Sequence, residues 1–225
     1  MTSNSDYTHI FETKIMVFDF DGVIIDSTEV KVDEYRNLFS QFTKNEVTLN
    51  KIINIYRNSA GIPRETTLKK VFKEVLGKTL SNQEVENLSL DYSKQIFQRL
   101  EAIEPLKGFL EYLAIHKEIN KHIISGAPNS DVSYLIKKLN LTKYFKSIKG
   151  GPLNKKNAIT NIRNLAQVKA QDIVYFGDQK NDCIAAKSAG VDFIGINAGS
   201  NLDTMECKKF PDFEKLIAYE MADRL

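Results

Sequence analysis

The chain of 225 residues is poor in the residue types that mark disulfide-rich, zinc-binding and membrane proteins. It has only two cysteines, Cys183 and Cys207, and three histidines scattered along its length. Neither cysteine lies in a zinc-site spacing, and one possible pair is not a disulfide framework. No segment approaches the ~18 consecutive apolar residues that a membrane-spanning helix needs. We therefore expect a protein of the reducing cytoplasm that has no membrane partner.

The chain also lacks an excess of charge of either sign. Its 31 basic and 29 acidic residues give a net charge of +2. This balance provides no broad electrostatic surface for nucleic acid or an anionic membrane. The first residues, MTSNSDYTHIFETK, lack the charged and then apolar run of a signal peptide. We expect no nucleic-acid partner, and the oligomeric state, monomer or homodimer, stays open.

The pattern of apolar residues predicts an α/β protein with an early helical insertion. One short apolar run, residues 14–18 (KIMVF), is typical of a strand, and four helix-like segments follow it between residues 29 and 100. From Pro105 onward strands alternate with helices, which predicts a doubly wound parallel sheet. The further strands are expected at residues 122–125, 145–149, 173–176 and 193–196. We predict a core of residues 10–27 and 103–225, and an all-helical cap of residues 28–102.

Three of the predicted strands end in polar residues. The first ends in Asp19 and Asp21, and the strand IVYFG ends in Asp178, with Asp182 one helical turn later. In an open parallel sheet the carboxyl ends of the strands form the ligand-binding edge, so the four carboxylates are expected to meet there. Such crowding is unfavourable unless a cation or a shared proton relieves it. Oxygen ligands without histidine or cysteine favour Mg²⁺ over Zn²⁺.

The same edge offers groups that can hold an anion. The strand HIIS ends in Ser125 and Gly126, which supply a hydroxyl and an unhindered backbone N–H. Lys155 follows the run GGPLN at the start of a predicted helix, and Lys156 beside it is the alternative. A phosphate next to a carboxylate nucleophile needs such a cation to offset its negative charge. By themselves, however, Ser125 and Gly126 are more typical of a strand-to-loop turn, and Lys155 of a solvated lysine, than of an anion site.

Together these motifs resemble the haloacid dehalogenase superfamily, across nearly the whole chain. DFDGVIIDS, HIISGAP, GGPLNKKNAI and GDQKND stand in the order of its four motifs, each behind the expected element. The resemblance implies a Rossmann-like core, and the insertion resembles the small helical cap of the phosphoglycolate phosphatase and β-phosphoglucomutase branch. It implies a Mg²⁺-dependent phosphatase that acts on a small phosphorylated metabolite, such as a sugar phosphate or a phosphoglycolate-like compound.

The resemblance also implies a role for each matching residue. Asp19 is the nucleophile that forms an aspartyl-phosphate, and Asp21 is the acid and base. Ser125, the Gly126 N–H and Lys155 hold the phosphoryl oxygens. Mg²⁺ is held by the Asp19 carboxylate, the Asp21 carbonyl and Asp178, whereas Asp182 is either a further ligand or a residue that orients one. The loop of residues 22–27 is expected to be the hinge of the cap.

Departures from the family pattern define the alternatives. Dehalogenases need no second aspartate, so Asp21 argues against that activity. β-Phosphoglucomutases usually carry a histidine where Lys31 stands, and a phosphosugar mutase therefore remains an alternative. Lys31 is also the residue to consider for the Schiff base of a phosphonatase. A further alternative is a non-catalytic module that binds Mg²⁺ and phosphate, although such a module needs no second acid at Asp21.

The residues that select the substrate cannot be read from these motifs. Specificity is expected to reside mainly in the cap, where Arg57 and Arg64 flank the segment NSAGIP between two predicted helices. That segment is placed to reach the catalytic edge. Exposed arginines are common on protein surfaces, however, and an ordinary surface position is the competing interpretation of both.

Overall fold

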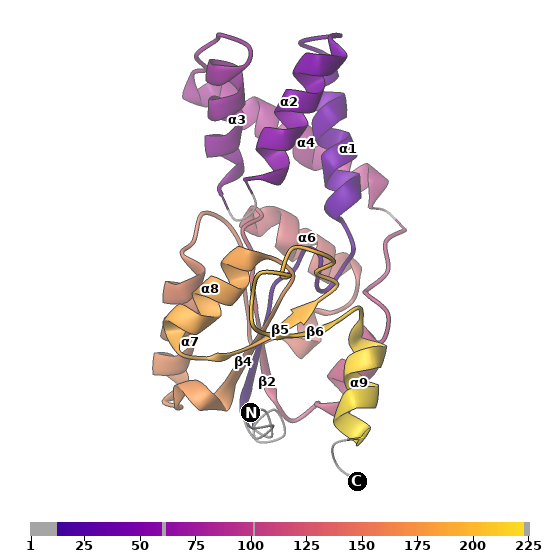
Figure 1. Ribbon diagram of the computed structural model, residues 1–225, viewed down its shortest axis with the longest axis vertical. Coiled ribbons are helices and arrows are strands. Elements are labelled where there is room, and N and C mark those ends of the chain that lie inside the picture. Colours follow the sequence, from indigo (N-terminus) through magenta and orange to yellow (C-terminus); the bar gives the residue numbers. More distant parts are fainter. Residues whose placement is uncertain (1–12, 60–61, 101, 223–225) are drawn as a thin grey trace.

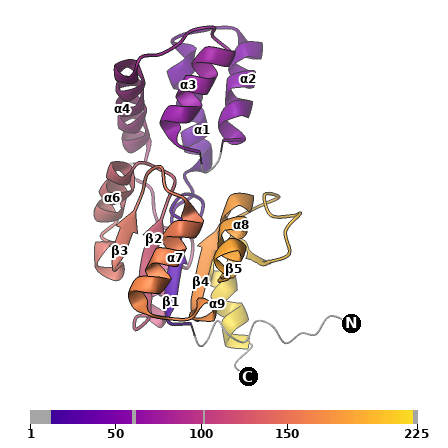
Figure 2. The same cartoon turned by 90° about the vertical axis from the view of Figure 1, so that its left-hand side faces the viewer.

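The protein has two lobes, shown by a computed structural model in which residues 13–59, 62–100 and 102–222 are described. A parallel sheet with helices on both faces forms the lower lobe, and a group of helices lies beyond one edge of that sheet (Figures 1 and 2). Residues 10–12, 60–61, 101 and 223–225 of the predicted core and cap lie outside the described residues, and so does the middle of the segment NSAGIP. The exact domain boundaries stay a prediction.

Within the described residues, six parallel strands form one sheet in the order β3-β2-β1-β4-β5-β6. Their bounds are β1 (Ile15–Phe18), β2 (Asn120–Ile124), β3 (Ser147–Lys149), β4 (Ile173–Gly177), β5 (Asp192–Ile196) and β6 (Lys208–Phe210). The first strand is central: Phe18 pairs with Ile123 of β2 on one side and with Phe176 of β4 on the other. The carboxyl ends of β1, β2 and β4 therefore lie side by side, which confirms the predicted doubly wound architecture.

Alternate residues of β1 pack on opposite faces of the sheet, as the period of two in a strand requires. Ile15 and Val17 pack in the core beneath α7 (Lys155–Ala166) and α8 (Lys180–Ala189). Met16 and Phe18 belong to the core under α5 (Phe109–Ile115), α6 (Asn129–Lys138) and α9 (Phe213–Ala222). Because both faces are covered, all four residues are buried and β1 reads as a continuous apolar run.

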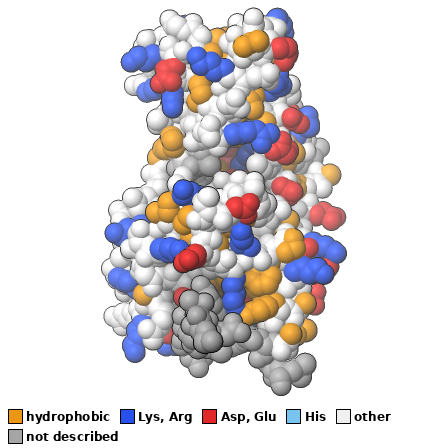
Figure 3. Space-filling model, viewed as in Figure 1, with side chains coloured by type: hydrophobic (Ala, Val, Ile, Leu, Met, Phe, Trp, Pro, Cys, Tyr) orange, Lys and Arg blue, Asp and Glu red, His pale blue; other side chains and the backbone are white. Residues whose placement is uncertain are grey.

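The helices inserted after β1 are α1 (Thr28–Ser40), α2 (Glu46–Arg57), α3 (Arg64–Glu74) and α4 (Asn82–Arg99). They share a buried aromatic centre, in which the rings of Tyr35 and Tyr56 stack at 4.1 Å and Phe39 contacts Phe72 at 5.4 Å. The capping box predicted at Ser81 and Glu84 is present at the start of α4. On the face shown in Figure 3, basic and acidic side chains are interspersed over both lobes.

Several element bounds differ from the sequence prediction, for local reasons. The helix expected from Leu106 begins only at Phe109, because Gly108 precedes it in the left-handed conformation at φ +77°. Strand β6 was not predicted, since Lys208–Phe210 contains no apolar run and exists through its pairing with β5. Two short 3-10 turns, Thr142–Tyr144 and Ala170–Asp172, precede β3 and β4. No described helix is long and apolar enough to span a bilayer.

Candidate active site

Asp19 and Asp21 lie on the loop that leaves the carboxyl end of β1. The Asp19 N–H donates to the Phe176 carbonyl at 2.9 Å, so the strand pairing with β4 continues up to the carboxylate. The chain then turns at Gly22, whose φ is +79°. A Cβ atom there would stand 2.6 Å from Cγ of Asp178, so only glycine lets the loop approach that carboxylate so closely.

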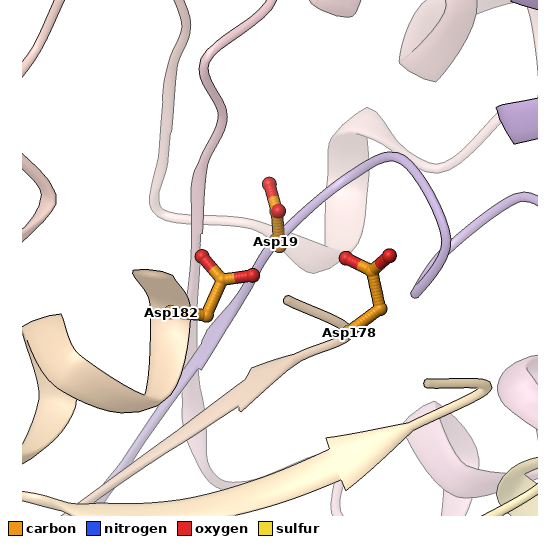
Figure 4. Close-up of side chains that lie close together, drawn as sticks. All are labelled: Asp19, Asp178 and Asp182. Atoms are coloured by element: carbon orange, nitrogen blue, oxygen red, sulfur yellow. The ribbon is translucent and has the colours of Figure 1, made fainter. Parts of the chain in front are cut away.

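Three carboxylates converge at this edge. Asp19, Asp178 and Asp182 are buried, and each has an oxygen within 4.8 Å of the other two. Their side chains point toward a common space (Figure 4). Burial raises the pKa of Asp19 to about 7, and burial and the neighbouring charges of Asp19 and Asp182 raise the pKa of Asp178 well above its usual range. These raised pKa values reflect crowding of negative charge at the edge of the sheet, which is the electrostatic setting of a cation site.

Lys155 is the positive group that reaches the carboxylates. Its Nζ lies 2.8 Å from Oδ2 of Asp19 and 2.5 Å from Oδ1 of Asp182. Burial opposes the charged form, but the two aspartates raise the pKa of Lys155 well above its usual range. The lysine is the first residue of α7, which Asn154 caps by accepting from the Asn157 N–H at 3.0 Å. Lys156 is exposed, so the structure brings Lys155 and not its neighbour to Asp19.

Asp182 is held from several directions. Besides Lys155, the Tyr175 hydroxyl donates to its Oδ1 at 2.9 Å, and the Gln179 N–H donates to its Oδ2 at 3.1 Å. Both oxygens therefore already have partners, and Asp182 fixes the position of the lysine ammonium. Tyr175 lies in the middle of the apolar strand β4, and sequence analysis treated it as an ordinary core residue. No local signal distinguishes it.

Asp21 contacts a cation that comes from the cap. Lys31 on α1 places its Nζ 2.5 Å from Oδ1 of Asp21, and the Ser27 hydroxyl donates to the same oxygen at 2.6 Å. Burial alone would raise the pKa of Asp21, but Lys31 and Ser27 lower it below its usual value. Sequence analysis singled out Lys31 for its family position but did not foresee this contact, because nothing in the spacing specifies it.

Ser125 and Gly126 stand at the end of β2, where the Ser125 N–H donates to the Lys149 carbonyl at 2.9 Å. Ser125 is buried, and its Oγ accepts from the Ala127 N–H at 3.1 Å. Both residues line one cleft of about 510 Å³ between the sheet edge and the inserted helices. All seven residues predicted for the site line this cleft: Asp19, Asp21, Ser125, Gly126, Lys155, Asp178 and Asp182.

The two arginines predicted for the cap also line the cleft but have different partners. Arg57 forms two hydrogen bonds of 2.8 and 2.9 Å with Glu29 on an exposed face of the cap. Arg64 is buried and reaches the core, where its Nη2 lies 2.7 Å from Oδ2 of Asp131 at the start of α6. Sequence analysis missed Asp131, which follows β2 in a stretch without any recognised motif.

Known proteins with similar sequences show the family of this chain. A family model described as haloacid dehalogenase-like hydrolase matches residues 16–196, more than half of the chain. The chain belongs to the haloacid dehalogenase-like hydrolases. It is 22% identical over 223 residues to a phosphoglycolate phosphatase of Pseudomonas fluorescens, covering 91% of this chain and 78% of that one. It is 24% identical over 186 residues to a phosphorylated carbohydrates phosphatase of Thermotoga maritima, covering 80% and 82% of the two chains.

A solved structure shows the same fold. The hydrolase YfnB of Bacillus subtilis, described as bound to magnesium with interdomain movement, superposes with a TM-score of 0.70 at 15% identity. The match covers 92% of this chain and 98% of that chain. The family membership and the enzyme class predicted from the motifs, a phosphoric monoester hydrolase, are confirmed by these comparisons.

Proposed function

We propose that this protein is a Mg²⁺-dependent phosphatase that hydrolyses a small phosphorylated metabolite through an aspartyl-phosphate on Asp19. The observation that carries the proposal is the pairing of charges at the end of β1. Asp19 contacts Lys155 of the core, Asp21 contacts Lys31 of the cap, and Asp178 adds a further carboxylate beside Asp19. A nucleophile, an acid and a cation site thus occupy one cleft.

The donor set fits a magnesium ion. Its carboxylates are buried and close together, and among the described residues no histidine or cysteine joins them. We assign Asp19, the backbone carbonyl of Asp21 and Asp178 as the groups that hold the ion. Of the two roles predicted for Asp182, the orienting one is favoured, because its oxygens already accept from Lys155, Tyr175 and Gln179. Bound Mg²⁺ would neutralise charge on the carboxylates and the transferring phosphoryl group.

In the first chemical step a carboxylate oxygen of Asp19 forms a bond to phosphorus while the bond from phosphorus to the ester oxygen breaks. Lys31 and Ser27 lower the pKa of Asp21 in the absence of substrate, so Asp21 must take up a proton when the anionic substrate binds; it gives this proton to the leaving oxygen as it departs. Lys155, Ser125 and the Gly126 N–H hold the phosphoryl oxygens on the other side. In the second step Asp21 accepts a proton from water, which attacks phosphorus, releases phosphate and restores the Asp19 carboxylate.

The size of the cleft beneath the cap is evidence for a small substrate. With the cap in the position seen here, the cleft holds about 510 Å³, which suits a metabolite and not a protein or nucleic acid. The names of the relatives, phosphoglycolate phosphatase and phosphorylated carbohydrates phosphatase, support a phosphorylated metabolite. We propose that the cap moves, that the enzyme acts in the cytoplasm, and that it needs no macromolecular partner for catalysis.

The proposal is tested by phosphate release from a panel of phosphorylated metabolites. We expect activity to vanish after exhaustive chelation and to return with Mg²⁺. Steady turnover also distinguishes an enzyme from a non-catalytic module that binds Mg²⁺ and phosphate. Full activity after chelation, with no response to Mg²⁺, would contradict the proposal.

Titrations of two variants separate the cation site from the anion site. Asp178→Ala should weaken Mg²⁺ binding more than Lys155→Ala does, because Asp178 faces the cation. Lys155→Ala should raise the vanadate dissociation constant more, since its ammonium faces the anion. Lys156→Ala is the matched control from the same turn of α7. The reversed ranking would show that the two roles are misassigned.

A further inference from the structure

The cap side of the cleft carries polar groups that the proposed chemistry does not use. Lys31, Tyr35 and Tyr56 line the cleft opposite Lys155 and the phosphoryl-binding residues. They come from α1 and α2, so they face the part of the substrate that leaves with the ester oxygen. We call these three residues the cap wall.

Lys31 is fixed beside the leaving group by its contact with Asp21. Its side chain is only 13% exposed, and its Nζ lies 2.5 Å from Oδ1 of Asp21. If Asp21 donates its proton to the ester oxygen, the ammonium stands next to the first carbons of the leaving group. An ammonium has three N–H donors, and the contact with Asp21 occupies one of them. Once Asp21 has given up its proton, its carboxylate neutralises the ammonium, so the remaining N–H donors of Lys31 are better suited to a neutral oxygen acceptor than to a second anion.

Tyr56 supplies the complementary acceptor. The Tyr92 hydroxyl donates its only proton to the Lys31 carbonyl at 2.7 Å, so in the 2.9 Å contact between the two tyrosine hydroxyls Tyr56 is the donor. Burial raises the pKa of Tyr56, which keeps that proton in place at neutral pH. The proton of Tyr56 is thereby committed, and its oxygen is left to accept a hydrogen bond from a ligand in the cleft.

Tyr35 is the buried member of the cap wall. Its side chain is fully buried, and its hydroxyl has no hydrogen-bond partner among the described residues. The ring is stacked on that of Tyr56 at 4.1 Å, which holds it in the cap wall. Buried hydroxyls without a partner are rare in native proteins, because their lost hydration is not replaced. Tyr35 therefore acts on the cap wall through its ring, which fixes the position of Tyr56.

We infer that the cap wall is a subsite for hydroxyl groups, and that the substrate is the phosphate ester of a polyol or sugar. A hydroxyl accepts from Lys31 and donates to Tyr56, whereas a carboxylate can only accept and would meet the Tyr56 oxygen as a second acceptor. A hydrocarbon leaving group could neither accept from Lys31 nor donate to Tyr56. This inference rests on the proposed phosphatase function, which places the leaving group against Asp21.

Binding measurements test the subsite separately from turnover. In an Asp19→Asn background with Mg²⁺, calorimetry gives the dissociation constants of glycerol 1-phosphate, propyl phosphate and phosphoglycolate. The first two share a three-carbon skeleton and differ in their hydroxyls, and the third carries a carboxylate. We expect glycerol 1-phosphate to bind at least about tenfold more tightly than either of the others, as two hydrogen bonds allow.

Variants of the cap wall connect that preference to the residues. Lys31→Met and Tyr56→Phe, each added to Asp19→Asn, should reduce the preference for glycerol 1-phosphate over propyl phosphate by about fivefold to tenfold. Tyr56→Phe removes a single oxygen and keeps the result interpretable if Lys31→Met folds poorly. Lys51→Met, an exposed lysine of α2, and Tyr134→Phe, an exposed tyrosine of α6, are the matched controls and should keep the preference.

The outcomes discriminate between the two proposals. Equal binding of the three esters, tighter binding of phosphoglycolate, or variants that weaken all three esters to the same extent would overturn the subsite. Absence of phosphate release from every ester by the wild-type enzyme with Mg²⁺ would overturn the phosphatase. A persistent preference for glycerol 1-phosphate in that case would leave the cap wall standing as a hydroxyl-binding site.

Discussion

Each of the two aspartates after β1 contacts a buried lysine from a different part of the chain. Lys155 comes from the core and lies between Asp19 and Asp182, whereas Lys31 comes from the cap and meets Asp21. Buried charges are costly unless they are paired, and each lysine lowers the pKa of the aspartate that it contacts. Burial nevertheless raises the pKa of Asp19, whereas Lys31 and Ser27 together outweigh burial and lower the pKa of Asp21.

Replacement of the nucleophile should separate activity from stability. Asp19→Asn should lower phosphate release by at least about a thousandfold, because an amide does not attack phosphorus. Burial raises the pKa of Asp19 to about 7 because it favours the neutral carboxylic acid. Without metal, the stability contributed by this side chain is therefore fully present below its unfolded pKa and is lost as the pH rises through about 7. The variant should therefore gain more stability at about pH 8 than at about pH 5.

Urea unfolding of the metal-free proteins at both pH values measures this gain. Asp91→Asn, which changes an exposed carboxylate on α4, is the control and should show no such gain. Wild-type turnover by Asp19→Asn would show that another residue is the nucleophile.

We expect His122 to lower the free energy of unfolding as the solution becomes mildly acidic. Burial, together with the charges of Lys146 and Lys149, lowers the pKa of His122 to about 4, and its Nδ1 lies 2.7 Å from the Ser147 hydroxyl. The folded state thus favours the neutral ring. Its contribution to stability is present above the unfolded pKa of about 6.5 and is lost as the pH falls toward 4.

His122→Gln should therefore lose less stability than the wild type between about pH 7 and pH 5. Unfolding by urea at the two pH values, with the difference between the two proteins taken at each, isolates the histidine from other titrating groups. Equal loss in both proteins would contradict the assigned pKa. Between about pH 7 and pH 8.5 the two proteins should keep a constant difference.

At the scale of single elements, the starts of α7 and α8 carry much of the site. Lys155 is the first residue of α7, and Asp182 lies in the first turn of α8, where it accepts the Gln179 N–H. Helix starts have backbone N–H groups without helical partners, so a capping side chain fixes the first turn. By fixing the first turns of α7 and α8, these capping contacts determine the positions of the Lys155 ammonium and the Asp182 carboxylate.

Loss of the N-terminal capping side chain of α7 should therefore affect anion binding. Asn154→Ala removes the acceptor of the Asn157 N–H and should cost about 1 kcal/mol of stability, while the frayed turn should raise the vanadate dissociation constant. Asn45→Ala is the matched control, since Asn45 caps α2 through the Thr48 N–H at 3.0 Å. It should cost a similar stability without changing vanadate binding. Equal effects of both variants on vanadate would contradict the argument.

At the scale of the whole molecule, an ion pair joins the cap to the core on the side of α4 and α6. Arg64 of α3 contacts Asp131 of α6 at 2.7 Å, and the Ser93 hydroxyl of α4 donates to the same carboxylate oxygen at 2.9 Å. The rings of Phe97 and Tyr134 meet beside it at 4.5 Å. These contacts hold α4 over α6, as Figure 2 shows from the side. They oppose any opening of the cleft about the loop after β1.

Asp131→Asn should loosen the cap. The amide leaves the buried guanidinium of Arg64 without its anion, and opening of the cleft is the way for that charge to reach water. We expect a larger radius of gyration by small-angle scattering and a raised KM for the substrate. Glu46→Gln, which weakens an exposed ion pair within the cap, is the control and should change neither. An unchanged radius and KM in Asp131→Asn would show that this pair does not restrain the cap.

The sequence by itself determined the features of the fold that depend on residues close together along the chain. The apolar run before Asp19 indicated a buried strand, and Ser81 and Glu84 indicated a capping box. Both patterns involve residues only a few positions apart, so they can be recognised directly in the sequence. The order of the motifs then placed the site residues at one sheet edge, since parallel strands share their carboxyl ends. For this reason the α/β class and the family were predictable.

Only the tertiary structure decided which polar groups face one another across the cleft. The motif pattern favoured Lys155 and left Lys156 as an alternative, and the rotation of α7 brought Lys155, not Lys156, to Asp19. The contacts of Lys31 with Asp21 and of Arg64 with Asp131 join segments whose approach depends on how the cap packs. Periodicity specifies which face of an element is buried, but a side-chain partner from a distant segment is fixed only when the packed elements bring the two together.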